Sequence, residues 1–300
     1  MKVKISIILI VLIAFICIVS SCKTVDILAQ VASATGLISS NTASAISLSA
    51  RAIGTAVEDI TPEQEYYIGR AVAANILNTY RIWNGNPALT SYLNLICTAI
   101  TINSPIPDIY SGYHVAILDS QEINAFATSG GHIFVTRGLI SAAKTEDALA
   151  AVLAHEISHI QLMHGVKAIK SNRITQAIMV SGTAAAGAAT GMDVNQLTDI
   201  FNESIGEIVQ TMVNNGYSQT QEFEADTMAM SLLAAAGYNP SGLIDMLNEL
   251  NKIQTSSSSG FGKTHPTPAQ RISNAQSSIA RFNVADTGSS RYARFTAATR

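Results

Sequence analysis

One helix-forming stretch near the middle of the chain, between Thr145 and Gly165, constrains the fold most. It contains the pattern His155-Glu156-x-x-His159, and two histidines four residues apart project from one face of a helix, where both can bind one Zn²⁺. The apolar side chains of the stretch fall in one sector, with Glu156 in its middle. A carboxylate buried there without a partner costs roughly several kcal/mol, and a water beside a bound metal would be such a partner. The alternative is an ordinary amphipathic helix with two hydrogen-bonded histidines, which the buried glutamate fits poorly.

The composition is that of a chain that can fold around a large core. Hydrophobic residues make up 48% of the 300 residues, which is enough for one large domain or two small ones. Charged residues make up only 13%, the net charge is −3, and the sequence has no basic cluster. Because proteins that bind nucleic acid neutralise phosphates with such clusters, we expect no nucleic-acid partner.

The N-terminus has the features of a bacterial export signal. Lys2 and Lys4 precede an uncharged apolar run that ends in Val-Ser-Ser-Cys at Cys22, the pattern of a secretory signal peptide. The ending resembles a bacterial lipobox, which implies cleavage after residues 1–21 and a diacylglycerol on the Cys22 sulfur. An uncleaved membrane anchor is the alternative, although about 15 apolar residues are short for a span.

Lys23 and two low-complexity segments bear on how the chain contacts the membrane. Lys23 follows the lipidated position. Resemblance to bacterial lipoproteins that lack an aspartate there predicts that the protein is located in the outer membrane, facing the periplasm. Residues 22–60, rich in Ala, Ser and Thr, are predicted to be a tether or an N-terminal helix. The uncharged Ala/Gly stretch 174–192 is predicted to be a loop between helices, with a membrane-touching hairpin as the alternative.

The elements between these segments predict an α+β domain that is mostly helical, over residues 61–285, with a C-terminal tail at 286–300. Capping and periodicity predict helices at 62–80 and 87–102, and Thr145 and Gly165 are expected to begin and end the motif helix. Short runs of strand-forming residues flank a Gly-Gly turn, which predicts a hairpin within a small antiparallel sheet. The predicted strands cover 113–118, 123–127 and 132–136.

A second helix supplies the remaining ligand candidate. Ser218 and Gln221 have the spacing of a capping box, which predicts a helix from there to Ala236. On that helix Glu222 and Asp226 share an apolar face. A catalytic zinc needs at least three protein ligands and one position for water, so Glu222 is the candidate third ligand. Asp226 would accept the outer N–H of a ligating histidine; a surface salt bridge is the alternative for Glu222.

Four motifs between residues 62 and 283 resemble the gluzincin metalloproteases that include HtpX, the CAAX prenyl endopeptidase and periplasmic lipoproteins of the LoiP and BepA type (family M forty-eight). The motifs are Asn124-Ala125-Phe126-Ala127 with the Gly-Gly turn, Ala154-His155-Glu156-x-x-His159 followed by His164, Glu222-x-x-Ala225-Asp226, and the run from Thr264 to Ile272. The metzincin alternative fails because its third histidine would stand at Gly165. The chain departs from the family in having Gln219 where many members have arginine after the serine.

The resemblance implies a zincin-like catalytic domain with one Zn²⁺ per chain, held on the active-site helix. His155, His159 and Glu222 would bind the metal, and Glu156 would be the general base of peptide hydrolysis. The expected substrates are unfolded or misassembled envelope proteins. An extended substrate would add as a strand to 132–136 or its neighbour, with Asn124, His132, Ile133 and Phe134 as the expected contacts.

Two C-terminal residues leave alternatives open. In relatives the histidine at His265 can approach the metal and regulate access, and the arginine at Arg271 can help hold the active site together; a simple turn before the last helix is the other interpretation of His265. A fourth ligand at His265 would close the zinc site. That arrangement would suit a membrane-anchored chaperone or assembly factor, or a latent protease opened by movement of the His265 loop.

Overall fold

The computed structural model describes residues 31, 33–36, 61–167, 216–254, 265, 268–282 and 288–299. The predictions for the signal peptide 1–21, for Cys22, for nearly all of 22–60 and for 174–192 lie outside these residues. The chain divides into two compact units, and the unit formed by residues 60–167 and 209–300 contains the motifs singled out above. In the described ranges, no helix is both long enough and apolar enough to cross a membrane.

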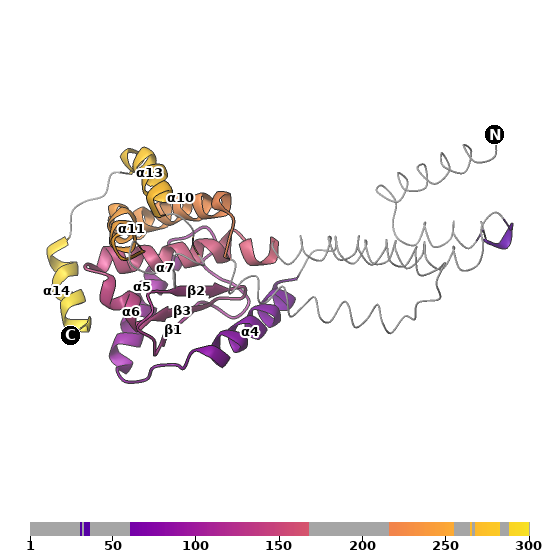
Figure 1. Ribbon diagram of the computed structural model, residues 1–300, viewed down its shortest axis with the longest axis horizontal. Coiled ribbons are helices and arrows are strands. Elements are labelled where there is room, and N and C mark those ends of the chain that lie inside the picture. The colour runs from indigo at the N-terminus through magenta and orange to yellow at the C-terminus, as the bar shows by residue number, and fades with distance from the viewer. Residues whose placement is uncertain are drawn as a thin grey trace. The chain divides into compact units, whose positions relative to one another are not determined.

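A small three-stranded sheet lies between helices α4 (Pro62–Thr79) and α7 (Glu146–Gln161) (Figure 1). Strands β2 (Ala125–Thr128) and β3 (His132–Thr136) form the predicted antiparallel hairpin, and β1 (His114–Leu118) pairs with β3 in parallel. The strand order is β1-β3-β2, so β3 lies between the two strands that precede it in the chain. The sheet is mixed because β3 pairs in parallel with β1 and antiparallel with β2. At the turn, a Cβ on Gly131 would lie 2.1 Å from the Gly112 carbonyl oxygen, so this position requires glycine.

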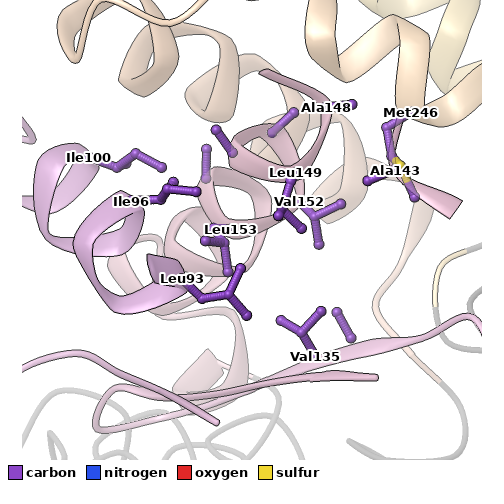
Figure 2. Close-up of a cluster of buried hydrophobic side chains, with 14 of the residues drawn as sticks. Leu93, Ile96, Ile100, Val135, Ala143, Ala148, Leu149, Val152, Leu153 and Met246 are labelled. Carbon is purple, nitrogen blue, oxygen red and sulfur yellow. The ribbon is translucent and has the colours of Figure 1, made fainter. Parts of the chain in front are cut away.

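Strand alternation gives the sheet two buried faces. Phe134 and Phe126 point to one face, where they pack on Val72 and Ile76 of helix α4 (Pro62–Thr79). Neighbouring strand residues point to the other face and join the main core. Figure 2 shows Val135 of β3 beneath side chains from α5 (Pro87–Thr101) and α7 (Glu146–Gln161).

Helix α7 is central to the main core and is buried on every side. It packs against the sheet and α5 on one side, and against α10 (Gln219–Ala235) and α11 (Ser241–Gln254) on the other. The sequence predicted one apolar sector on this helix, whereas the structure packs other elements against it on all sides, as for a helix inside a core. Its polar motif residues consequently lie in the protein interior.

The end of α7 differs from the prediction. Thr145 caps its first turn by accepting from Ala148 N–H, as expected, but the helix ends at Gln161. Met163 then adopts a left-handed conformation (φ 54°), and Gly165 lies in the helical turn that follows. The chain thus turns at a residue other than glycine, a strained arrangement that places residue 164 close to the helix it has just left.

Residues 288–299, within the segment expected to be a C-terminal tail, form a helix that packs on the domain. The remaining elements of the unit are α6 (Arg137–Ala142), α13 (Pro268–Ser278) and the 3₁₀ turn η1 (Ile279–Arg281). The last element is α14 (Gly288–Thr299). Arg291 of α14 pairs with Asp147 at 3.1 Å and Arg294 pairs with Glu146, both at the N-terminus of α7. These side chains and buried Phe295 join α14 to the core.

Candidate metal centre

Four buried donors converge between α7, α10 and residue 265. They are His155, His159, Glu222 and His265, whose ligand atoms all lie within 4.8 Å of one another. His155 Nε2 is 3.0 Å from His159 Nε2 and 3.4 Å from Glu222 Oε2, and His159 Nε2 is 3.5 Å from Glu222 Oε1. Ligands of a tetrahedral zinc with bonds of about 2.0–2.1 Å are about 3.3 Å apart. The spacing and the nitrogen and oxygen donors therefore fit zinc.

His265 lies at the same spacing as the other three donors. Its Nδ1 is 3.0 Å from Glu222 Oε1 and 3.4 Å from His155 Nε2. The structure thus brings it into the position of a fourth ligand, which the simple-turn interpretation did not require. A centre with four protein donors has the coordination of a closed zinc site.

The outer side of His155 is held by a buried ion pair. His155 Nδ1 lies 3.0 Å from Asp226 Oδ1, a contact through which a carboxylate can fix the tautomer of a ligating histidine. Arg271 of α13 donates to both Asp226 oxygens, from Nε at 2.8 Å and from Nη2 at 2.6 Å, and its Nη1 is 3.1 Å from Glu222 Oε2. Arg271 therefore joins the two acidic residues of α10 to the histidine of α7.

The outer side of His159 is held by two residues for which the sequence predicted no role. His164 Nδ1 lies 2.9 Å from His159 Nδ1, and Tyr217 stacks on the His159 ring with centroids 4.0 Å apart. His164 Nε2 is 3.2 Å from Glu224 Oε2, and the Glu224 side chain is half exposed. His164 appeared in the family motif, but its contact depends on the turn at Met163, which no local pattern predicts.

Glu156 lies beside these donors with an unsatisfied oxygen. Its side chain is buried, and Oε1 accepts no hydrogen bond from the residues that the structure describes. His265 Nε2 is 3.7 Å from this oxygen, beyond hydrogen-bond range. A buried carboxylate oxygen of this kind is costly unless something at the centre supplies a donor.

Burial and charge give the residues of the centre different proton affinities. Burial raises the pKa of Glu156 and lowers the pKa of His159. Burial also opposes the ionised form of Glu222, but the charges of His265 and Arg271 outweigh it and lower the pKa of that carboxyl group. For Asp226, burial is likewise outweighed by the charge and hydrogen bonds of Arg271, which lower its pKa to about 2. Glu222 is thus held as an anion, the form that binds a metal.

The structure does not bring the predicted substrate strand to an edge. His132, Ile133 and Phe134 belong to β3, which is hydrogen-bonded on both sides, so no further strand can add to it. Instead His132 stacks on Tyr66, and the other two are buried in the two cores. Of the two places expected for the substrate, 132–136 or its neighbour, the first is therefore enclosed, because β1 pairs with β3 from outside the hairpin.

The edge of β1 is also covered, and this leaves β2. The side chain of Asn94 accepts from Val115 N–H at 2.9 Å and donates to the Val115 carbonyl at 2.8 Å, as a neighbouring strand would. Trp83 N–H donates to the Ile117 carbonyl at 2.7 Å. Asn124, the remaining predicted contact, directly precedes β2 and is buried.

Two histidines and a carboxylate around a buried His-Glu-x-x-His helix define a metallopeptidase type of centre. The chain belongs to Peptidase family M48, whose sequence profile matches residues 88–279. That match covers more than half of the chain and includes α7, α10 and α13, the helices that build the centre.

Characterised relatives share this part of the chain. Metalloprotease LoiP of Escherichia coli is 32% identical over 152 residues, which are 51% of this chain and 57% of LoiP. The beta-barrel assembly-enhancing protease of Escherichia coli is 26% identical over 199 residues, 64% of this chain and 39% of that protein. Mitochondrial metalloendopeptidase OMA1 of Schizosaccharomyces pombe is 28% identical over 185 residues, 61% and 51% of the two chains. This chain therefore spans between about two fifths and three fifths of these relatives.

Proposed function

We propose that this protein is a zinc metalloendopeptidase in which His155, His159 and Glu222 hold one zinc ion per chain and Glu156 is the general base. The observation that carries the proposal is the buried Glu156 carboxylate, which lies beside the donor cluster with an oxygen that accepts no hydrogen bond from the described residues. A zinc ion at this centre supplies Lewis acidity that polarises the scissile carbonyl and favours loss of a proton from water. Proton transfer and the orientation of the ligands are carried out by the side chains of the protein.

Glu156 carries the proton through the reaction. It accepts a proton from the attacking water as the oxygen adds to the carbonyl carbon, and it delivers that proton to the leaving amine nitrogen as the C–N bond breaks. Burial raises its pKa, which brings the carboxyl group closer to neutrality and suits it to both transfers. Asp226 and Arg271 keep His155 oriented throughout.

We propose strand β2 as the place where an extended substrate adds. Thr136 N–H donates to the Asn124 carbonyl at 3.1 Å, and antiparallel alternation then directs the Ala125 carbonyl and both backbone groups of Ala127 away from β3. The Ala125 N–H donates to the Asn124 side chain at 3.0 Å. β2 also packs against α7, the helix that carries Glu156. Recognition through backbone groups predicts loose sequence preference and a need for unfolded segments.

The proposed setting is the bacterial envelope. The basic start, the apolar run and the small residues before Cys22 support export and a lipid anchor, in the outer membrane facing the periplasm. The name of the beta-barrel assembly-enhancing protease supports misassembled envelope proteins as the substrate class. The biological role would then be quality control.

A latent or closed centre is a second candidate, because His265 has the spacing of a fourth ligand. In that form no position is left for water, and the chain would act as a chaperone or assembly factor until His265 withdraws. Cleavage would then depend on a signal that moves the segment around residue 265.

The experiment compares the full chain, purified in mild detergent, with Glu156→Gln and His265→Ala, using unfolded casein as substrate and zinc quantified in each sample. Glu156→Gln should keep its zinc and lose cleavage. If His265→Ala cleaves casein and the wild type does not, the latent form is established. If zinc is bound and neither the wild type nor His265→Ala cleaves casein, the closed-site chaperone replaces the peptidase; full activity of Glu156→Gln would remove Glu156 from the mechanism.

A further inference from the structure

His164 has a position that the proposed reaction does not use. It follows Met163, whose left-handed conformation turns the chain back on α7, and its side chain is buried against His159. The two rings meet through their Nδ1 atoms, 2.9 Å apart. Met163 itself is 46% exposed, so its own packing does not account for a strained conformation, whereas the placement of His164 does.

The proton positions on the two rings follow from this contact. His159 directs Nε2 toward His155 and Glu222, so a neutral His159 that binds metal through Nε2 carries its proton on Nδ1. That N–H faces His164 Nδ1, which must therefore be the acceptor. His164 then carries its own proton on Nε2, the atom that lies 3.2 Å from Glu224 Oε2.

We propose that His164 is a positioning residue for the metal centre. Its Nδ1 accepts a hydrogen bond from the outer N–H of His159, and its own ring is held by a hydrogen bond from Nε2–H to Glu224. The proposal rests on the proposed zinc site and names the residue that fixes its second histidine. Helix α10 thereby acts twice, through Glu222 at the metal and through Glu224 two residues later. Tyr217, just before the N-cap of α10, stacks on the His159 ring and limits its tilt.

The two histidines of the motif are held by different chemistry. His155 bonds to Asp226, an anion neutralised by buried Arg271. His159 bonds to the imidazole of His164, which in turn contacts Glu224, an acid whose side chain is 51% exposed. Removing an outer hydrogen bond of this kind typically lowers metal affinity about 10- to 100-fold.

The test measures zinc affinity of the full chain by competition with a chelator. His164→Phe keeps the ring shape and removes the acceptor, and we expect a loss of about 10- to 100-fold. His164→Asn can place Oδ1 where Nδ1 was and should restore most of the affinity. His114→Phe is the matched control, because His114 is an exposed histidine of β1, and it should leave affinity unchanged.

A second measurement determines the tautomers of the two rings in the wild type, and a variant serves only to assign the signals. Long-range ¹H–¹⁵N spectra of the zinc-loaded chain, with the His164 signals assigned by their loss in His164→Asn, should show His159 protonated on Nδ1 and His164 on Nε2. A proton on His164 Nδ1, or equal zinc affinity in His164→Phe and wild type, would overturn the role of His164 alone. Absence of zinc binding by the wild type would overturn the metal site as well.

Discussion

Replacing Arg271 with methionine tests whether one buried cation holds the centre together. The guanidinium is 1% exposed, and it contacts Asp226 and Glu222, whose side chains are fully buried. Methionine keeps an unbranched apolar chain of similar length and removes the charge. Two carboxylates would then remain in the interior with their strongest cationic partner gone.

The expected cost can be estimated in two ways. Breaking a buried ion pair by removing one partner costs about 3–5 kcal/mol. Independently, burial alone would raise the pKa of Asp226, yet Arg271 and His155 lower it from 3.8 to about 2, which corresponds to roughly 2 to 3 kcal/mol for that carboxylate alone. Adding the contact with Glu222 brings the second estimate toward the first, so we expect a loss of about 3–5 kcal/mol in the free energy of unfolding.

The assay is urea unfolding of the metal-free chain at pH 7 with a chelator present. The matched control is Arg137→Met, which removes an arginine that pairs with Asp119 at 2.8 Å where both side chains are well exposed. A surface pair contributes at most about 1 kcal/mol. If Arg271→Met costs no more than this control, the buried pair does not hold the centre and the reasoning is wrong.

The difference between wild type and Arg271→Met should also depend on pH. In the wild type the folded pKa of Asp226 is depressed, so its contribution is fully present above the unfolded value of 3.8 and is lost as pH falls toward 2. In the variant, burial without Arg271 raises the folded pKa of Asp226, so protonation at low pH favours the folded state. The difference in unfolding free energy should therefore shrink between pH 7 and 3, and a constant difference would contradict this.

Two further substitutions test the packing around the centre. Gly69→Ala places a Cβ 1.3 Å from the Ser129 carbonyl oxygen, so α4 must shift off the sheet; we expect a loss of about 2–3 kcal/mol in urea unfolding, whereas an unobstructed helical glycine would gain up to about 1 kcal/mol. Arg294→Met leaves the buried Glu146 carboxylate without its guanidinium and should cost about 1–3 kcal/mol. Adding Glu146→Gln to that variant should recover part of the loss in thermal unfolding, and no recovery would show that α14 does not act through this pair.

The sequence by itself determined the local structure and most of the donor set. Ser218 and Gln221 predicted the start of α10, and both halves of the capping box are present. The polar residues on apolar helix faces, Glu156, Glu222 and Asp226, were singled out because burial without a partner is costly, and the structure places all three in the centre. The sequence could single these residues out because capping and helical periodicity depend on residues within one or two turns of each other.

Only the tertiary structure decided which distant segments contact one another. It made β3 the central strand, against the prediction of a substrate edge at 132–134, because β1 pairs with it from outside the hairpin. It brought His164 to His159 through the turn at Met163, and α14 to the start of α7. Such contacts join residues through packing of whole elements, and the free energy that selects one packing is a sum over the core, which no short stretch of sequence contains.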